Sequence, residues 1–438
     1  MSSNVIKISA LVAGGYGLGR LEGKVIFVPG TLRDEVVEIE VIESKPHHSL
    51  AQLIKVIEPS PQRVIPGCPV FGQCGGCQWQ HIDSAFQHLI KKDLVIDALT
   101  RIGKLNLPEE INLTPAASPR HYRHRLRLQV RGQGGQRRWG FFVPRSHVLI
   151  PITDCLLANS LVNQIIQEVS QYLPDLPGDD SLKEIEIVSS PEEGQGVVLC
   201  RFTPGARPGH KTAWARIADA CPSVKAVVVA TGDRIMIVPG LEAGLRYTFT
   251  VENDQTKNDL TYRLQPGVFT QSNLGMNQEL INLVVTLAQV RPGDTVWDLF
   301  CGAGNLSLPL ALTAGQLTGV EFSPAAIQNA DYNAGTNGLG NCRFLVGRVD
   351  KFLAGSRQRT GRPAIVVLDP PREGASGLGR QMDKIRPDRI IYVSCNPATL
   401  ARDAAHLYKA GYRLSRLEVL DMFPQTHHVE TIARFEPI

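Results

Sequence analysis

The feature that most constrains the fold is a regular alternation of strand-like and helix-like segments that begins at about Arg263. Such an alternation is typical of α/β domains, in which parallel strands are joined by right-handed helical crossovers. Residues 251–438 are therefore predicted to form one α/β domain. The predicted strands are 295–299, 316–321, 364–369 and 388–394, and the predicted helices are 277–290, 305–314 and 324–335.

Composition excludes several classes of protein. The chain has 438 residues, of which 43% are hydrophobic and 20% charged, and its net charge is +4. Neither wholesale disorder nor a histone-like polycation is expected from these values. The apolar runs are strand-sized and the first residues lack a signal-peptide pattern, so neither a membrane span nor secretion is expected. The nine Cys are an odd number, which argues against a disulfide framework and favours a cytoplasmic protein with reduced thiols. No segment resembles an obligate dimer seam, so a monomer is expected.

The length predicts two or three domains, since a single domain has about 100–200 residues. Short Val- and Ile-rich strands separated by turns predict a small β-barrel over residues 1–60. A Pro-rich linker over 59–69 leads into a central domain, 61–250, which is predicted to be strand-rich and α+β. Within it, residues 83–103 are predicted to form a helix with Asp83 as N-cap, which packs on the α/β domain.

A glycine-rich turn follows the first strand of the α/β domain, in the segment Asp298-Leu-Phe-Cys-Gly-Ala-Gly-Asn305. Its glycines allow close backbone approach to a ligand, and Glu321 ends the next strand, where an acidic residue binds ribose hydroxyls in nucleotide-binding sheets. A structural turn and a dinucleotide site are the alternatives. The dinucleotide fingerprint needs Gly or Ala at position 307, which is Ser, and the Lys of a P-loop is missing. The pattern resembles the S-adenosylmethionine site of class I, Rossmann-like methyltransferases.

Two further strand ends carry reactive side chains. Cys395 follows a predicted strand, and ligands of α/β sheets bind at the carboxyl ends of strands. It is a candidate nucleophile as a thiolate, while the alternative is a small buried core Cys, which the polar neighbours Ser394 and Asn396 disfavour. The segment Asp369-Pro-Pro-Arg372 ends in Arg, where amino-methylating enzymes have an aromatic residue, and this favours methylation of carbon. Glu430 taken alone would be an ordinary solvated charge.

Taken together, the motifs resemble the RNA 5-methyluridine methyltransferase family in order and spacing, at 269–273, 298–305, 369–372, 394–397 and 423–430. The N-terminal barrel also resembles a TRAM domain, a small OB-like RNA-binding barrel, so the resemblance covers nearly the whole chain. It implies methylation of carbon 5 of a uridine in structured RNA, with 23S rRNA as the expected substrate and tRNA as the alternative. A non-catalytic RNA-binding iron–sulfur protein that keeps the fold is a third possibility, which the intact Cys395 and Glu430 disfavour.

The resemblance also implies roles for individual residues. The Cys395 thiolate would attack carbon 6 of the uracil, which activates carbon 5 toward the methyl group of S-adenosylmethionine, and Glu430 would remove the carbon-5 proton. One departure from the family is Arg348, with Asp350, at a position near the adenine that is usually acidic or an amide. The residues implied to contact the cofactor are Gln271, Phe300, Asn305, Glu321 and Asp369.

Cys68, Cys74 and Cys77 form a tight trio. Spacing alone does not separate zinc from an iron–sulfur cluster, since thiolates bind both. The family resemblance implies a 4Fe–4S cluster in a structural and RNA-positioning role, with Cys155 as the distant fourth ligand. The remaining cysteines outside the catalytic position are expected to be packing residues: Cys200, Cys221, Cys301 and Cys342.

Eight Arg and no Asp or Glu lie from Arg120 to Arg145, with aromatic residues interleaved. Arg binds phosphates and stacks on bases, and aromatic residues stack on unpaired bases. A solvated strand face, the alternative, usually carries mixed charge, so this segment is predicted to bind RNA. The barrel has seven basic and seven acidic residues within 1–63, so its RNA-binding role rests on the resemblance alone. The target uracil must be unstacked to reach Cys395.

Overall fold

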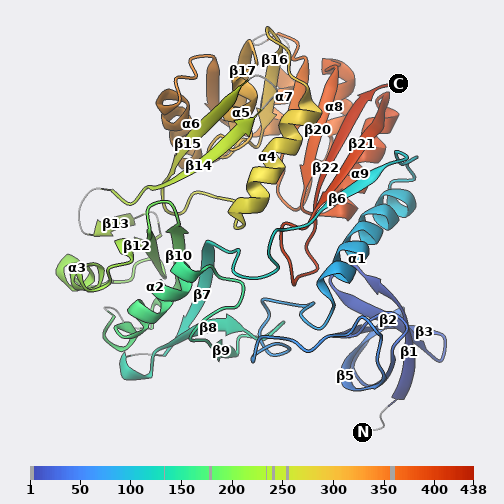
Figure 1. Cartoon of the computed structure of the whole chain (residues 1–438), viewed down its shortest axis with the longest axis vertical. Coiled ribbons are helices and arrows are strands. Elements are labelled where there is room, and N and C mark those ends of the chain that lie inside the picture. Colours follow the sequence, from blue (N-terminus) through green and yellow to red (C-terminus); the bar gives the residue numbers. More distant parts are fainter. Residues whose placement is uncertain are drawn as a thin grey trace.

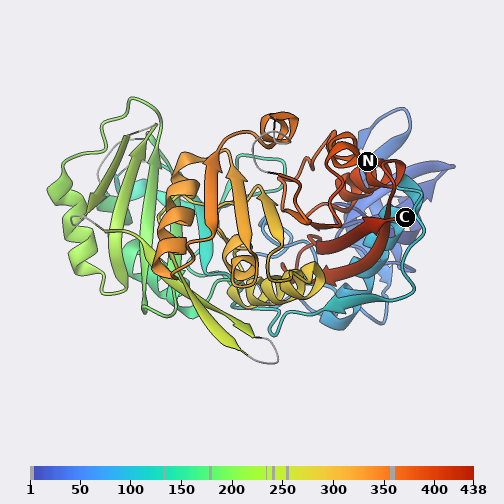
Figure 2. The same ribbon diagram turned by 90° about the horizontal axis from the view of Figure 1, so that it is seen from above.

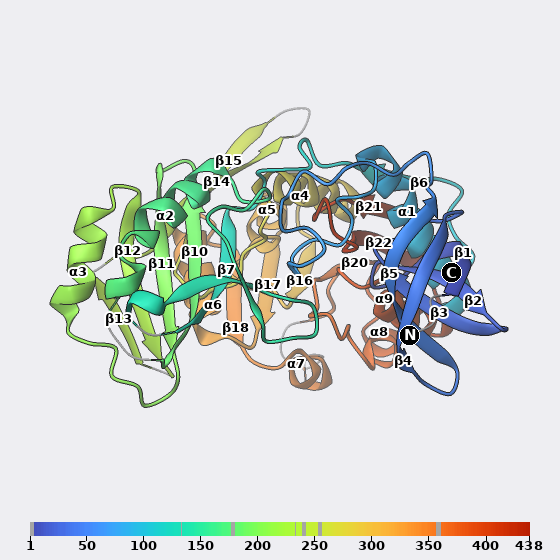
Figure 3. The ribbon, with the colours of Figure 1, turned by 90° about the horizontal axis from the view of Figure 1, so that it is seen from below.

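The computed structural model describes residues 4–132, 134–176, 180–232, 234–238, 242–252, 256–355 and 361–438. Figure 1 shows an N-terminal barrel in blue, a central sheet mainly in green, and a C-terminal α/β part in yellow to red. Seen from below, the central sheet and the barrel lie at opposite ends of the molecule (Figure 3). Within the described ranges, no helix combines the length and the apolar character that crossing a membrane requires.

The N-terminal strands close into a barrel, as the short Val- and Ile-rich runs predict. Successive side chains of a strand point to opposite faces, and one face of each strand supplies the barrel core, which includes Ile8, Val28 and Ile39. Neighbouring strands are β1 (Asn4–Val12), β2 (Tyr16–Leu21), β3 (Lys24–Pro29), β5 (His48–Glu58) and β4 (Val36–Ser44), and β4 returns to β1.

The central part is a seven-stranded sheet in the order β13-β12-β11-β10-β7-β8-β9. Its strands pair antiparallel except for β11 and β12, which are parallel. Apolar side chains of two helices, among them Ile165 and Trp214, pack into its core. The elements are β7 (Arg125–Arg131), β8 (Arg138–Phe142), β9 (Leu149–Pro151), α2 (Ser160–Ser170), β10 (Leu182–Ser190), β11 (Gln195–Phe202), α3 (Lys211–Ala220), β12 (Val224–Thr231) and β13 (Arg234–Val238).

The C-terminal part is an eight-stranded sheet in the order β18-β17-β16-β19-β20-β22-β21-β6. Pairing is parallel from β18 to β20, as the alternation of strands and helices predicts, and β22 is antiparallel to β20. Figure 2 shows the parallel strands between the central sheet and the β21–β22 pair. The elements are α4 (Leu274–Ala288), β16 (Thr295–Leu299), α5 (Ser307–Ala311), β17 (Gln316–Glu321), α6 (Pro324–Thr336), β18 (Cys342–Val346), α7 (Val349–Gly355), β19 (Ile365–Leu368), α8 (Leu378–Ile385), β20 (Arg389–Ser394), α9 (Pro397–Lys409), β21 (Tyr412–Leu420) and β22 (Glu430–Pro437).

Two segments of the predicted central domain join the C-terminal part instead. β6 (Ile111–Thr114) pairs in parallel with β21 at the edge of the eight-stranded sheet. β14 (Leu245–Glu252) forms a hairpin with β15 (Lys257–Leu264), and the hairpin packs on α6, whose Asn333 Oδ1 accepts a hydrogen bond from Arg263 N at 2.8 Å. The predicted boundary at 250/251 therefore cuts through β14, and the predicted range 61–250 is interrupted by β6.

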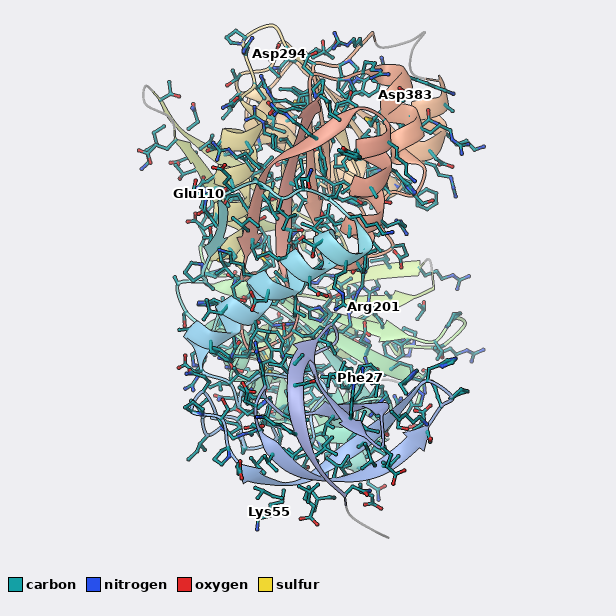
Figure 4. All side chains as sticks on the ribbon, turned by 90° about the vertical axis from the view of Figure 1, so that its right-hand side faces the viewer. Phe27, Lys55, Glu110, Arg201, Asp294 and Asp383 are labelled. Carbon is teal, nitrogen blue, oxygen red and sulfur yellow. The ribbon has the colours of Figure 1, made fainter. Side chains whose placement is uncertain are left out.

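Helix α1 (Ser84–Asp97) crosses between the barrel, which carries Phe27 and Lys55, and the C-terminal part (Figure 4). Asp83 is its N-cap as predicted, because its side chain accepts from the N–H groups of the first turn. The helix continues into a π-helical turn, Ala98–Ile102. Val95, Ala98 and Leu99 share a hydrophobic core with Leu400 and Ala404 of α9, so the helix packs on the α/β part.

Candidate active site

The glycine-rich turn after β16 has a backbone that favours glycine at two positions. Gly302 and Gly304 have φ angles of 54° and 89°, and Phe300 has a φ of 67°. A Cβ on Gly304 would lie 2.4 Å from Leu308 Cδ1. Hydrogen bonds from Phe300 N and Cys301 N to the carbonyl of Val320, at 2.9 and 3.2 Å, fix the turn against β17.

A cavity at the carboxyl ends of β16 and β19 brings together four of the five residues expected to contact the cofactor: Gln271, Phe300, Asn305 and Asp369. The fifth, Glu321, holds the rim of the turn, since its carboxylate accepts from Gly302 N at 3.3 Å and from Ser323 N at 2.9 Å. The cavity has further lining residues that sequence reasoning missed, from the central part, the β14–β15 hairpin and α4: His124, Tyr247, Phe249, Tyr262 and Asn277. They lie outside the motifs, and no local sequence signal marks them.

Polar contacts organise the floor of this cavity. Asn277 and Asn305 exchange side-chain hydrogen bonds of 2.9 and 2.8 Å. Asp298 is buried at the end of β16 and accepts a hydrogen bond from Ser307 Oγ at 2.5 Å. Burial raises the pKa of Asp298 to about 7, although the Ser307 hydrogen bond opposes this shift. The cavity thus has a buried carboxyl that titrates near neutral pH.

Cys395 lies just after β20, where two loops are tied together. The side chain of Asn396 caps α9 and donates to the carbonyl of Arg372 at 3.1 Å, and Thr399 Oγ1 donates to the same carbonyl at 3.2 Å. Ser394 Oγ donates to Asn396 O at 3.1 Å. The Asp369–Arg372 loop and the Cys395 loop, predicted from separate motifs, therefore form one structure.

Charged groups surround the Cys395 thiol. Burial raises the pKa of Cys395 to about 11, the negative charges of Glu430 and Asp369 add to the shift, and the positive charge of Arg372 opposes it. Burial raises the pKa of Asp369 to about 7. Burial, with a contribution from Asp369, also holds the pKa of Glu430 well above its ordinary value. Cys395, Glu430 and Asp369 therefore lie close enough for their charges to shift one another's pKa values, and they are called the electrostatic unit below.

A groove leads from Cys395 to the barrel. It is lined by Cys395 and Arg372 on one side, by His427 and His428 beside them, and by α1 and residues 10–14 of the barrel. Burial and the nearby charge of Arg372 lower the pKa of His427 to about 4. Burial and the neighbouring His427 lower the pKa of His428 to about 3. The two imidazole rings, with centroids 4.2 Å apart, therefore present an uncharged surface at neutral pH.

The four cysteines expected to bind a cluster line one cavity of the central part: Cys68, Cys74, Cys77 and Cys155. Burial is the main cause that raises the pKa of Cys77 to about 12, and the neighbouring Cys155 and Cys74 contribute to this shift. All nine cysteines are free of disulfide bonds. In the part of the chain that the structure describes, no three His, Cys, Asp or Glu side chains are placed to hold a single metal ion.

Acidic residues of a neighbouring strand neutralise part of the Arg-rich segment. Arg125 and Arg127 on β7 pair with Glu186 and Glu184 on β10. Sequence reasoning missed these pairs because Glu186 lies 61 residues after Arg125. The side chain of Arg137 is buried, whereas Arg138 and Arg145 are exposed. The segment is therefore only partly a basic surface. Arg348 and Asp350, which depart from the family pattern at the position expected near the adenine, form an ion pair. Arg348 donates two hydrogen bonds of 3.0 Å to Asp350.

The sequence matches the family model of the tRNA (Uracil-5-)-methyltransferases over residues 107–435, which is most of the chain, and that of the TRAM domain over residues 6–54. The chain belongs to this methyltransferase family. The family predicted from the five motifs and the N-terminal barrel is thereby confirmed, and the barrel is a TRAM domain.

Similarity to curated relatives of this methyltransferase extends over nearly the whole chain. The enzyme is 35% identical over 448 residues to the 23S rRNA (uracil(1939)-C(5))-methyltransferase RlmD of Aromatoleum aromaticum, which covers 99% of each chain. It is 34% identical over 430 residues to RlmD of a Shewanella species, covering 96% of this chain and 93% of the relative.

A solved structure shares the fold of the whole methyltransferase. The tRNA (uracil-54, C5)-methyltransferase of Pyrococcus abyssi, in complex with S-adenosyl-L-homocysteine, has a TM-score of 0.72 at 21% identity, and the match covers 98% of this chain and 100% of that chain. The family match makes the protein an RNA (uracil-5-)-methyltransferase, and the shared fold agrees with that assignment.

Proposed function

We propose that this methyltransferase acts on a uridine in 23S rRNA through a covalent adduct with Cys395. The observation that supports the reaction is the grouping of Cys395, Arg372, Asp369 and Glu430 at one edge of the sheet. The choice of RNA is supported by relatives of nearly equal length that are named for 23S rRNA and are 34% to 35% identical. Transfer RNA, named for the fold neighbour, is the alternative substrate.

Carbon 5 of uracil is a weak nucleophile and needs activation. Addition of the Cys395 thiolate to carbon 6 forms a carbon–sulfur bond and turns the carbon 5–carbon 6 double bond into an enolate. Carbon 5 of the enolate then attacks the methyl carbon of the cosubstrate. The new carbon–carbon bond forms as the methyl–sulfur bond breaks, and S-adenosylhomocysteine is the leaving group. Carbon 5 now carries both the new methyl group and its original hydrogen.

Glu430 completes the reaction as a general base. Its carboxylate takes the carbon-5 proton, the electron pair of that bond restores the double bond, and the Cys395 thiolate leaves carbon 6. The buried position of Glu430, 3% exposed, suits this role because a raised pKa makes its carboxylate a stronger base. The same burial keeps water from competing for the proton.

The cosubstrate is held at the carboxyl ends of β16, β17 and β19. Glu321 ends β17, where it suits the ribose hydroxyls, and Asp369 lies between the cosubstrate cavity and Cys395 in the electrostatic unit. Four of the proposed contacts line the cavity and the fifth borders its loop: Gln271, Phe300, Asn305, Asp369 and Glu321.

A 4Fe–4S cluster is the proposed occupant of the four-cysteine cavity. The donor set fits, since four thiols from two distant segments converge in an otherwise largely apolar cavity beside Phe71 and Leu157. Thiolates bind both zinc and iron–sulfur clusters, and the cluster is preferred because the family resemblance implies it with this cysteine spacing. The role is structural and RNA-positioning, because methyl transfer consumes no electron. The enzyme is proposed to act as a cytoplasmic monomer, where thiolate ligands stay reduced.

The substrate is tested by mapping 5-methyluridine in 23S rRNA and tRNA from cells with and without the gene. Loss of one rRNA site supports the proposal, whereas loss of a tRNA site alone overturns the choice of RNA.

Cys395→Ala is expected to abolish methyl transfer to an RNA transcript, and undiminished transfer would refute the covalent step. Iron and sulfide in equal amounts are expected in protein purified without oxygen, and zinc without iron would refute the cluster.

A further inference from the structure

The loop 421–429 connects β21 to Glu430 and forms part of the wall of the groove at Cys395. Tyr122 and Asn273 donate to its carbonyls at Pro424 and Met422, at 3.0 and 3.1 Å. It makes further contacts with residues 78–91, the segment that leaves the cysteine trio and enters α1, which is called the bracing segment here. Contacts between the two segments involve buried side chains and backbone groups.

Gln87 is the centre of these contacts and is 1% exposed. Its Nε2, which has two hydrogens to donate, lies within hydrogen-bonding distance of three acceptors: the carbonyls of Trp79 and Ile82, at 3.1 and 2.9 Å, and Gln425 Oε1 at 3.2 Å. Its Oε1 accepts from Gln425 N at 3.0 Å. Both ends of one amide side chain are therefore used to join the bracing segment to the loop.

The backbone carbonyl of Gln425 also bonds to the bracing segment. Its carbonyl accepts from Gln78 N at 3.2 Å and from Trp79 N at 3.1 Å, and its own φ is 67°. Its backbone N–H, its carbonyl and its side chain thus all bond to the bracing segment. At the start of the loop, Lys91 Nζ donates to Asp421 Oδ1 at 2.5 Å and to Phe423 O at 3.0 Å.

Cys395 is held by different contacts. Its loop is anchored by Asn396 and Thr399 to the carbonyl of Arg372, and none of these bonds involves the bracing segment. Loosening the loop 421–429 should therefore disturb Glu430 and spare the nucleophile. We propose that Gln87 is a positioning residue that sets the loop 421–429, and through it Glu430, for removal of the carbon-5 proton; this rests on the proposed role of Glu430 as base.

The experiment separates proton removal from the earlier steps. A 23S rRNA transcript made with 5-fluorouridine forms the adduct and accepts the methyl group, but carbon 5 has no proton to lose, so the adduct persists. In the full-length enzyme, Gln87→Met is expected to form this adduct at a rate within about twofold of the unaltered enzyme. On an ordinary transcript its turnover should fall by between about ten- and a hundredfold, because general bases are sensitive to position, and methylated covalent adduct should accumulate.

Two further variants guard against misfolding. Gln425→Gly tolerates the positive φ and removes only the side chain, so it should show the same split to a smaller degree. Lys92→Met, on the same helix at a side chain without a polar partner in the described structure, should leave both rates unchanged. A melting curve will show whether Gln87→Met folds. If it does not, the rates of adduct formation and turnover of Gln425→Gly decide whether the positioning role holds.

Glu430→Gln, measured in parallel, distinguishes the two proposals. Rapid turnover by Glu430→Gln overturns the base assignment itself. A second outcome overturns the positioning role alone. In it, Glu430→Gln accumulates adduct, which supports the base assignment, but the folded Gln87→Met and Gln425→Gly variants lose adduct formation and turnover to the same extent. Full turnover in both of those variants overturns it as well.

Discussion

At the scale of single residues, the active site concentrates acidic groups around a thiol. Asp369 and Glu430 both raise the pKa of Cys395 beyond what burial does, and Arg372 is the charge that opposes them. The arrangement favours neutral, protonated forms before RNA enters. Removal of these protons is therefore part of the energetic cost of the reaction, and the Arg372 guanidinium is placed to lower that cost.

Asp298 predicts a pH-dependent stability. Its pKa is about 7 in the folded protein against an ordinary value of 3.8, so its contribution to stability is fully present below the unfolded pKa and is lost as the pH rises toward 7. Asp298→Asn removes this loss. The melting temperature of the variant, relative to the unaltered protein, should increase from about pH 5 to about pH 8. A difference that stays constant across this range would contradict the burial argument.

Sequence reasoning reached the residues that stand in motifs at strand ends. Cys395, Asp369 and Asn305 were identifiable because the carboxyl ends of parallel strands meet at one edge. His124, which precedes β7, and Tyr247, on β14, were not, because neither stands in a motif at a strand end. Their place in the cosubstrate cavity depends on how the parts pack, and no local pattern encodes that packing.

At the scale of elements, the turn after β16 contains two glycines, Gly302 and Gly304, that look alike in sequence but differ in the space around an added Cβ. The new Cβ of Gly302→Ala has no atom within 4 Å, so this variant loses stability only through its φ of 54°. Gly304→Ala loses stability through a φ of 89° and also through displacement of Leu308. A left-handed backbone costs about 1–2 kcal/mol. Denaturant unfolding should therefore show a larger loss for Gly304→Ala, and calorimetry should show weaker S-adenosylmethionine binding. Equal losses would contradict the packing argument.

The ion pair between α1 and the loop 421–429 gives a second test at this scale. Lys91 and Asp421 are 0% and 2% exposed, and breaking a buried pair costs about 3–5 kcal/mol because one charge stays buried without its partner. His88 also contacts Asp421, at 3.1 Å, and should keep the loss of Lys91→Met near the lower value. Lys92→Met, the neighbouring control, should change the free energy of unfolding by less than about 0.5 kcal/mol. Similar values for both variants would refute the role of the pair.

Only some elements of the C-terminal part were predicted. The strands β16, β17, β19 and β20 and the helices α4, α5 and α6 follow from apolar alternation. In contrast, α9 and β21 were not predicted, although they have 13 and 9 residues. The predicted helix 305–314 begins later, at Ser307, because Asn305 is engaged with Asn277. β6, with residues 111–114, is too short to show a period, and its identity as a strand comes from its partner β21.

At the scale of the whole molecule, the basic surface divides into exposed and paired arginines. Phosphate contacts release counterions, so each lost contact should reduce the slope of log affinity against log salt by about 0.7 to 0.9. Arg138→Ala and Arg145→Ala are expected to show this reduction in RNA-binding titrations. Arg125→Ala should lower the melting temperature instead, because it leaves Glu186 buried without one of its partners. An unchanged slope in both surface variants would exclude them from the RNA interface.

The overall charge pattern was the least predictable feature from sequence. A run of eight Arg without an acid suggested an uninterrupted basic face, yet β10 places Glu184 and Glu186 beside it. Counting charges along a chain ignores the neighbour that a sheet supplies across strands. The family resemblance, by contrast, survived intact because it rested on several separated motifs in a fixed order.

β6 has a consequence for how the enzyme is made. The partner of this strand, β21, begins at Tyr412, so the edge of the catalytic sheet stays open until almost the whole chain has been synthesised. An open edge exposes unpaired N–H and C=O groups that template aggregation, and pairing over such a distance folds slowly. A C-terminal fragment that begins at residue 251 would carry this exposed edge permanently, so an autonomous catalytic fragment has to begin before Ile111.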